Sequence, residues 1–411
     1  MNIVVIHKVP FSYIGYDKVI DHDVHNVIYV VLEKAVADIP ENLRCQRLKV
    51  GCFDEVKSVL QTIVNAKGIA IDRLISMSQY TLELAADLRQ FFSIPGHGPN
   101  FVARTENKVV MKSLLHGDGL LAPRFIRLSN GGEINKVKWA GKTILKPVSD
   151  TASRGVKDFE SPEMALAFYH RNLENSEYDW DKYELEQFIE GDIYHFDGFR
   201  VAGKTLLNIP SKFVGNCLDF AKGKAFGAVQ ADGQIEFEDQ LEKFLNSIGI
   251  QHGPFHLEAI NTKEGLCFLE VSSRVGGAGI QSCLEARTGL NMIHCELALQ
   301  LSDLPIDSNP FKDFFCFNPN ETNYGYFVFP GHQLESSDEI SLLNIDSFLD
   351  NSNLLKYHVQ KDLNEISSQI TYNDGEVPFS GIVATKSYKE SVALIQDILS
   401  SVKIAVNSRA Q

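Results

Sequence analysis

Two glutamates on a short hairpin have the spacing that most clearly suggests chemistry. Glu258 and Glu270 lie in two strand-like runs, 255–260 and 266–271, which the glycine-containing loop 261–265 separates. Because side chains alternate across a strand, such a hairpin brings the two carboxylates to one face. Paired carboxylates repel each other unless a cation neutralises them, and Mg²⁺ characteristically bridges protein carboxylates and substrate phosphates. The hairpin therefore predicts a magnesium site, with a surface hairpin of solvated glutamates as the alternative.

Further polar residues share the faces of these two strands. By the same alternation, His256 lies on the face of Glu258, and Ser272 and Arg274 lie on the face of Glu270. The Arg274 guanidinium could bind a phosphate or a carboxylate through two parallel N–H groups. The Arg-x-Gly-Gly continuation favours the functional interpretation of the hairpin over the solvated one.

A small-residue turn after Lys146 is a candidate phosphate loop. The lysine ends a strand at 143–146, and hydroxyl residues and a glycine follow it: Ser149, Thr151, Ser153 and Gly155. Backbone N–H groups and hydroxyls in such a turn can close over a polyphosphate, while the lysine supplies a point charge. The turn is not a Walker A loop, because the lysine precedes it and no Gly-Lys-Ser/Thr sequence occurs. Taken alone, this pattern more commonly marks an ordinary turn.

A strand at 183–189 that ends before Gly191 is the third candidate. Its end can offer backbone groups to the edge of an adenine, with Phe188 and Ile189 as apolar walls. Without context, the segment is typical of an ordinary amphipathic strand and turn. His195, at the start of the next strand, and His256 are as consistent with structural roles as with substrate contacts.

Strands that alternate with helices predict a small parallel α/β domain at the N-terminus. Buried strands are expected at 2–6, 27–32 and 73–77, and helices at 53–65 and 82–92. The Gly- and Pro-rich stretch 93–100 marks a domain boundary. His22 and His25 lie between the first two strands, where a solvated loop is expected.

The rest of the chain mixes short strands and helices, with a second boundary at 303–310. Central strands are expected at 124–127, 143–146, 183–189, 195–201, 255–260 and 266–271, and helices at 105–116, 161–172, 240–247 and 291–300. Ser161 and Pro162 are a typical N-cap and first helical residue. We therefore predict three domains: an N-terminal α/β domain at 1–100, a central domain at 101–305 and a C-terminal α+β domain at 306–411.

Composition limits the class of protein. The chain of 411 residues is 44% apolar and carries a net charge of −14, which excludes a general nucleic-acid binder with a basic face. A few lysines can still form a local pocket for an anionic nucleotide. The seven cysteines are scattered without a CxxC spacing, which predicts reduced thiols and no zinc site. Neither a signal peptide nor an apolar run of membrane-spanning length is recognisable, so we expect a cytoplasmic protein without membrane contact.

In chain order, these segments resemble the ATP-grasp superfamily along nearly the whole chain. The series comprises Lys108 at a helix start, Lys146 with its loop, Glu186-Gln187-Phe188-Ile189, the Glu258/Glu270 pair and Arg274. The combination Lys-Pro-Val…Ser-Arg-Gly-Val, His-x-Asp-Gly, His-x-Glu and Glu-x-x-x-Arg-x-Gly-Gly is most similar to L-amino-acid ligases. That family combines a Rossmann-like N-terminal α/β domain, a nucleotide clamp of two α+β subdomains and a C-terminal piece.

The resemblance implies ATP and Mg²⁺ as cofactors, with two magnesium ions, Mn²⁺ as an alternative ion, and a homodimer. The residues implied to bind ATP are Lys108, Lys146, Ser153, Arg154, Gly155, Glu186, Gln187, Phe188, Ile189 and Asp192. The metal would be held by Glu258, Glu270 and Ser272, while Arg274 would stabilise charge on the transferring phosphoryl group. Substrate contacts are implied for His195, His256, Gly276 and Gly277, and Lys212 could reach the γ-phosphate.

The sequence departs from the family pattern at several positions. Ser272 stands where the family usually has Asn. Ile193 stands where an acidic residue is frequent, which would either move the ribose contact to Asp192 or remove it. Gln79 replaces a common Glu, and the phosphate loop has one glycine instead of several. The lysines, carboxylates and arginine of the pattern are all kept.

The activity that the resemblance implies is the joining of a carboxylate to an amine, with small amino acids or related molecules as substrates and a dipeptide as the expected product. The carboxylate would attack the γ-phosphate of ATP, and the amine would then displace phosphate from the acyl phosphate. Two alternatives stay open at this point: a biotin-carboxylase-like ATP-dependent carboxylase, and an ATP-binding regulator without catalysis.

Overall fold

The computed structural model describes residues 1–130, 137–231, 237–302, 321–334, 338–360, 362 and 365–408. The chain divides into two compact units: Met1–Arg104 with Asn291–Pro310, and Thr105–Leu290 with Phe311–Gln411. The expected boundary at 303–310 and Cys316 lie outside the described residues. Within those residues, no helix is long and apolar enough to cross a membrane. The three-domain division at 100 and 305 stays a prediction.

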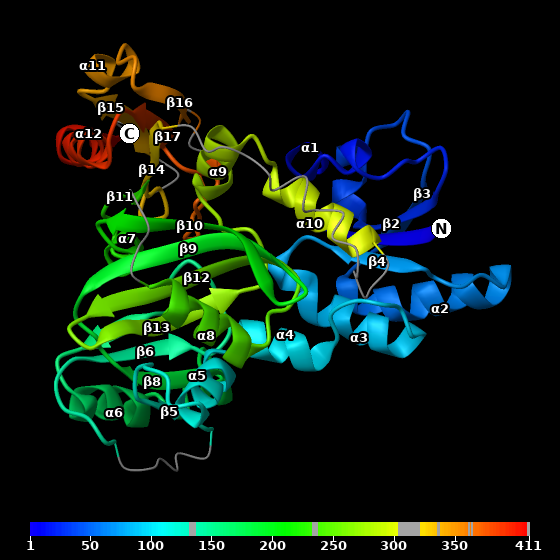
Figure 1. Cartoon of the computed structure of the whole chain (residues 1–411), viewed down its shortest axis with the longest axis horizontal. Coiled ribbons are helices and arrows are strands. Elements are labelled where there is room, and N and C mark those ends of the chain that lie inside the picture. Colours follow the sequence, from blue (N-terminus) through cyan, green and yellow to red (C-terminus); the bar gives the residue numbers. More distant parts are fainter. Residues whose placement is uncertain are drawn as a thin grey trace. The chain divides into compact units, whose positions relative to one another are not determined.

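The first unit is built on a parallel sheet, as the alternating pattern predicts (Figure 1). In sheet order, its strands are β3 (Gln46–Val50), β2 (Asn26–Leu32), β1 (Asn2–His7) and β4 (Arg73–Ser76). Of these four strands, β3 was not expected. Its helices are α1 (Phe11–Ile14), α2 (Val56–Lys67), α3 (Leu82–Phe92) and α10 (Met292–Leu301). Central parallel strands are covered on both faces, which explains the continuous apolar runs of β1 and β2. Val4, Val30 and Leu74 form one core with Leu60 of α2 and Leu88 of α3.

His22 contradicts the expectation of a solvated loop. Its ring is buried, with Nε2 lying 2.9 Å from the Tyr29 hydroxyl and Nδ1 lying 2.8 Å from the Ile20 carbonyl oxygen. Burial lowers the pKa of His22, and the contact with Ile20 offsets this only in part. The expectation failed because the neighbouring residues in the sequence are polar, whereas the aromatic partner lies on β2.

The second unit contains an eight-stranded antiparallel sheet in the order β13-β12-β9-β10-β11-β14-β17-β16. Its strands are β9 (Asp192–Val201), β10 (Lys204–Val214), β11 (Phe226–Gln230), β12 (Gly253–Thr262), β13 (Gly265–Ser272), β14 (Asn323–Phe329), β16 (Leu354–Val359) and β17 (Phe379–Thr385). The accompanying helices are α7 (Cys217–Ala221), α8 (Glu238–Ile248), α9 (Ile280–Thr288), α11 (Asp346–Leu349) and α12 (Tyr388–Ser401). A separate ribbon pairs β15 (Asp338–Leu343) with β18 (Lys403–Ser408). The C-terminal strands β14, β17 and β16 thus extend the sheet that carries the glutamate hairpin.

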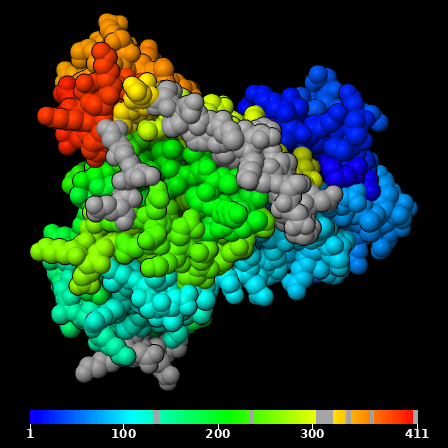
Figure 2. All heavy atoms as spheres, in the orientation of Figure 1, coloured from blue at the N-terminus to red at the C-terminus, as the bar shows by residue number. Residues whose placement is uncertain are grey.

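A four-stranded antiparallel sheet forms the other half of the second unit. In sheet order, its strands are β5 (Phe125–Arg127), β8 (Tyr183–Gln187), β6 (Thr143–Pro147) and β7 (Lys157–Phe159), and its helices are α5 (Lys108–Gly117) and α6 (Pro162–Arg171). The division between the two units falls within α4 (Pro99–Glu106). Helix α6 packs on this sheet through Tyr169, which shares a core with Leu145 and Leu185. Atoms of this half (cyan to teal) lie directly against those of the larger sheet (green) on the face shown in Figure 2. The mixed α/β and α+β fold class is therefore confirmed.

Helix α5 begins one turn later than the sequence suggests, because Asn107 interrupts the expected helix 105–116. The Asn107 side chain is an N-cap that accepts hydrogen bonds from the backbone N–H groups of Val109 and Val110, at 3.0 and 3.1 Å. We expect Asn107→Ala to lower the free energy of unfolding by about 1 kcal/mol, since two N–H groups lose their partner. Urea denaturation checks this value, and Asn107→Ser should retain most of the stability. Equal losses in both variants would contradict the capping role.

Candidate active site

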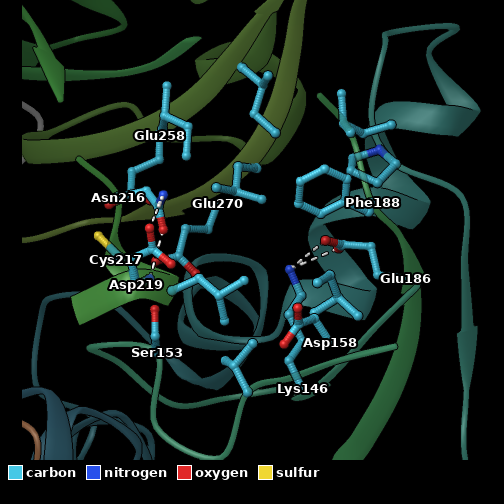
Figure 3. Close-up of a pocket in the computed structure, with 18 of the residues that line it drawn as sticks. Lys146, Ser153, Asp158, Glu186, Phe188, Asn216, Cys217, Asp219, Glu258 and Glu270 are labelled. Carbon is cyan, nitrogen blue, oxygen red and sulfur yellow. Dashed lines mark hydrogen bonds and ion pairs between the residues drawn. The ribbon is translucent and has the colours of Figure 1, made fainter. Parts of the chain in front are cut away.

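A cavity of about 490 Å³ lies between the two sheets of the second unit (Figure 3). Lys146, Glu186 and Phe188 lie along one side of it, and Glu258 and Glu270 lie along the other. Most residues expected to bind ATP or metal line this cavity: Lys108, Lys146, Ser153, Arg154, Glu186, Gln187, Phe188, Ile189, Asp192, Glu258 and Glu270. Residues from four separate stretches of the sequence are thus brought to one place.

The remaining candidates lie outside the cavity lining. These are Gly155, His195, His256, Ser272, Arg274, Gly276 and Gly277. Ser272 is the strand partner of His256 on the hairpin, next to the glutamate pair. Lys212, a candidate for the γ-phosphate, instead forms an ion pair with Asp192 at 2.6 Å. The Asp192 carboxylate, at the edge of the cavity, therefore already has the Lys212 ammonium as its partner.

The glutamate pair has the geometry that strand alternation predicts. Glu258 and Glu270 are direct partners in the β12–β13 ladder, and both side chains are half-buried. The Lys108 ammonium lies 2.9 Å from the Glu270 carboxylate and donates a hydrogen bond to the Asp150 carbonyl oxygen at 2.8 Å. Burial alone would raise the pKa of Glu270, but Lys108 and Lys146 outweigh it and lower that pKa. Glu270 is therefore held as a carboxylate beside the loop.

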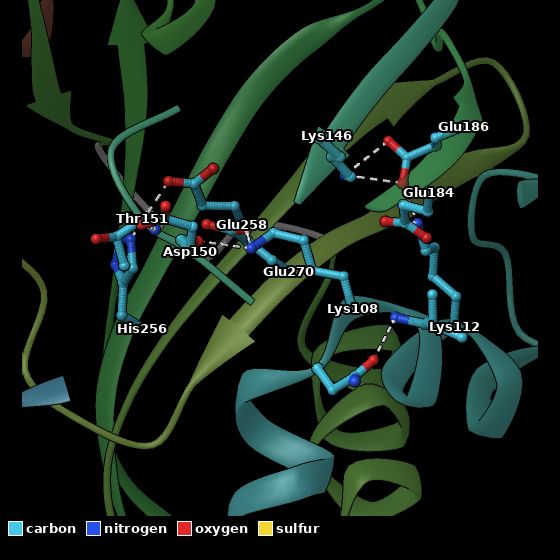
Figure 4. A network of polar contacts seen from close by, with 12 residues as sticks. Lys108, Lys112, Lys146, Asp150, Thr151, Glu184, Glu186, His256, Glu258 and Glu270 are labelled. Atoms are coloured by element: carbon cyan, nitrogen blue, oxygen red, sulfur yellow. Dashed lines mark hydrogen bonds and ion pairs between the residues drawn. The ribbon is translucent and has the colours of Figure 1, made fainter. Parts of the chain in front are cut away.

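A buried network of two lysines and two glutamates lies beneath the cavity (Figure 4). The Lys112 ammonium contacts Glu184 at 2.6 Å and also Glu186, and Lys146 contacts Glu186 at 2.8 Å. Lys112 and Glu184 are 0% exposed. Burial would lower the pKa of Lys146, but Glu186 and Glu184 reverse the effect and raise it. The network therefore keeps Lys146 charged at the wall of the cavity.

This network gives Glu186 two lysine partners and adds a residue that sequence reasoning missed. Glu186 is among the residues expected to bind ATP, and its carboxylate is buried between Lys112 and Lys146. Lys112 lies four residues after Lys108 on α5, so both ammonium groups leave the same face of the helix. That spacing was the available signal for Lys112 in the sequence.

Backbone groups at the end of β8 are partly engaged. The Gln187 N–H donates to the Arg124 carbonyl at 2.8 Å, and the Phe188 N–H donates to the Lys142 carbonyl at 3.0 Å. The Phe188 ring is 39% exposed and lines the cavity together with Ile189. An exposed aromatic ring at a cavity wall is suited to cover the face of a flat heterocycle.

The loop after Lys146 has an unusual backbone. Ala152, Ser153 and Gly155 all have positive φ, at 57°, 55° and 67°. Positive φ is strained for alanine and serine, and such strain concentrates at ligand-binding segments. The Arg154 guanidinium donates to the Ile370 carbonyl oxygen at 2.8 and 3.1 Å, which fixes the loop to the C-terminal segment. An ion pair at 2.7 Å between the Lys222 ammonium and the Asp158 carboxylate also joins the larger and the smaller sheet halves of the second unit.

A cluster of two histidines and an aspartate lies on the larger sheet beside Glu258. His195 and His256 each contact Asp197, at 2.5 and 2.8 Å. Burial alone would lower the pKa of His256, but Asp197 and Glu258 outweigh it and raise the pKa to about 10. The sequence contained this aspartate in its His-x-Asp-Gly motif, but its contact with His256 of another strand was not foreseen.

Comparisons with known proteins agree with this architecture, although no family model matches the chain. An L-arginine-specific L-amino acid ligase of Bacillus subtilis is 24% identical over 316 residues, which cover 74% of this chain and 69% of that protein. The crystal structure of an L-amino acid ligase from Bacillus licheniformis matches with a TM-score of 0.71 over 98% of both chains, at 16% identity. The biotin carboxylase domain of a 2-oxoglutarate carboxylase from Hydrogenobacter thermophilus matches with a TM-score of 0.62 over 98% of this chain and 90% of that chain, at 13% identity.

The chain has the ATP-grasp fold, as the resemblance predicts. The structural matches, at 13–16% identity, establish the fold. What the site can do chemically rests on its own residues: two lysines, a pair of carboxylates and a loop with strained backbone all line one cavity.

Proposed function

We propose that this chain is an ATP-dependent ligase that joins the carboxylate of one small molecule to the amine of another, with two amino acids as substrates and a dipeptide as product. The observation that carries this proposal is the convergence of Lys108, Lys146 and the Glu258/Glu270 pair on one cavity of an ATP-grasp fold. The sequence relative in Bacillus subtilis, an L-amino acid ligase, supports the same class of reaction.

The residues of the cavity fit a bound nucleotide triphosphate and a hard cation. Lys108 and Lys146 would neutralise the phosphates beneath the loop 150–156, and Phe188 and Ile189 would cover the adenine. Glu258 and Glu270 offer oxygen ligands, which Mg²⁺ prefers, at facing positions of the hairpin. We propose that two Mg²⁺ ions bind here, that Mn²⁺ can replace them, and that Ser272 is a metal ligand together with the two glutamates.

The proposed reaction has two steps. A carboxylate oxygen of the first substrate attacks the γ-phosphorus of ATP, and the bond from this phosphorus to the ADP oxygen breaks. The amine nitrogen of the second substrate then attacks the carbon of the acyl phosphate, and phosphate leaves as the amide forms. Magnesium would supply charge neutralisation for the phosphoryl transfer, and Arg274 would stabilise the same charge. The loop 150–156 would exclude water from the acyl phosphate.

The test is the release of ADP and phosphate with Mg-ATP across the twenty amino acids, singly and in pairs, with product masses. Release that depends on a pair, together with a new dipeptide mass, supports the ligase. Bicarbonate-dependent ADP release without amino acids would instead identify a biotin-carboxylase-like reaction. ATP binding without release under any mixture would identify a regulator. We also propose a homodimer, which light scattering on the purified protein checks, and a cytoplasmic location.

A further inference from the structure

Four polar side chains form a continuous chain of contacts on one face of the larger sheet. The Nδ1 atoms of His195 and His256 lie 2.5 and 2.8 Å from the two different carboxylate oxygens of Asp197. The Nε2 atom of His256 then lies 3.3 Å from a Glu258 carboxylate oxygen. These positions follow from the register of β9 with β12, which pairs Asp197 with His256 and His195 with Glu258.

Tight packing holds this chain in place. His195 and Asp197 are 1% and 2% exposed, and the His195 ring lies 4.9 Å from the Phe213 ring. Gly276 packs against the middle of this chain of contacts. A Cβ atom at this position would lie 2.8 Å from an Asp197 oxygen and 3.0 Å from His256 Nδ1, so a larger residue would press on both side chains. Both histidines therefore direct Nδ1 towards Asp197, and the substrate contacts expected for them stay a prediction.

The arrangement fixes the direction of His256. Because Asp197 uses one oxygen for each histidine, the His256 ring is oriented through Nδ1 and its Nε2 points towards Glu258. Carboxylates that hold a metal are generally oriented by hydrogen bonds from neighbouring groups, whose loss weakens metal binding. Glu270 has Lys108 as its neighbour, whereas Glu258 has His256.

We propose that Asp197 and His195 are positioning residues that orient the Glu258 carboxylate for magnesium through His256. This inference rests on the proposed function, because it concerns the metal carboxylate of the same site. A competing possibility is that His195, Asp197 and His256 bind a metal themselves, since their ligand atoms lie within 4.8 Å of one another. The 2.5 Å separation of His195 Nδ1 from Asp197 favours a hydrogen bond, because two ligands of one metal ion at ordinary bond lengths lie farther apart.

The test is the binding of Mn²⁺ to the full chain in the presence of a non-hydrolysable ATP analogue, followed by electron paramagnetic resonance of free Mn²⁺. Asp197→Asn is expected to weaken Mn²⁺ binding by roughly 10- to 100-fold. Its affinity for the analogue without metal should stay at the wild-type value, which a merely structural defect would not allow. His195→Asn is the second variant and should change Mn²⁺ affinity in the same direction while leaving Asp197 and His256 intact.

Glu242→Gln is the matched control. It makes the same change from carboxylate to amide in an ion pair with the same strand, because Glu242 contacts Arg200 of β9 at 2.8 Å. Its Mn²⁺ affinity should equal that of the wild type. If His195→Asn and Asp197→Asn both fold and both bind Mn²⁺ with wild-type affinity, the positioning role is overturned, while the proposed function stands.

Two further outcomes separate this inference from the function on which it rests. If the wild-type chain binds no Mn²⁺ with the analogue, the proposed function fails together with the inference. If the wild type binds Mn²⁺ or Zn²⁺ without any nucleotide, and His195→Asn abolishes that binding, the cluster is itself a metal site and the positioning role is overturned.

Discussion

Glu270→Gln is expected to lower ADP release by at least about a hundredfold at saturating ATP and amino acids, the range found when one group that stabilises transition-state charge is removed. The substitution keeps the shape of the side chain and removes its charge. Glu270 is the strand partner of Glu258, and Lys108 and Lys146 hold its pKa below the usual value, so the wild-type site contains a full carboxylate here. Initial rates of ADP formation at several Mg²⁺ concentrations measure the effect.

The fold should survive this change, because Glu270 is half-buried and an amide can still accept a hydrogen bond from Lys108. Glu264→Gln is the matched control, since Glu264 is exposed on the turn of the same hairpin. It should turn over at the wild-type rate. Wild-type turnover by Glu270→Gln would remove the magnesium hypothesis for this hairpin.

Lys112→Met is expected to destabilise the smaller sheet of the second unit by about 3–5 kcal/mol, because it leaves buried glutamates without one of their two lysines. Lys112 and Glu184 are both 0% exposed, and Lys112 contacts Glu184 and Glu186 together. Burial raises the pKa of Glu184, which Lys112 and Lys146 offset only in part, so loss of Lys112 favours its protonated form. Both tryptophans of the chain, Trp139 and Trp180, belong to this half, so fluorescence during urea denaturation reports on it.

A double-mutant cycle identifies the cause of that loss. In Lys112→Met combined with Glu184→Gln, the unpaired buried charge is removed, so the double variant should be more stable than the sum of the single effects predicts. Lys182→Met, which removes an exposed lysine paired with Asp179, should leave the transition unchanged. Additive effects at 112 and 184 would contradict a coupled buried network.

Contacts between neighbours in the sequence were predictable from local rules. The hairpin of Glu258 and Glu270 needs only alternation and a short turn, and the structure pairs the two residues directly. Ser161 caps α6 by accepting the Met164 N–H, as its type and place predict. The parallel sheet of the first unit followed from its alternating strands and helices.

The sequence by itself determined which residue types stand at the cavity, because the local elements that carry Lys146, Phe188 and the glutamate hairpin are specified by short-range patterns. The tertiary structure alone decided which partner each charge has. Lys112 and Glu186 are 74 residues apart, and Arg154 contacts a carbonyl 216 residues away. Such pairs depend on the order in which strands join a sheet, and a charged residue in a sequence carries no mark of the partner that strand order will place beside it.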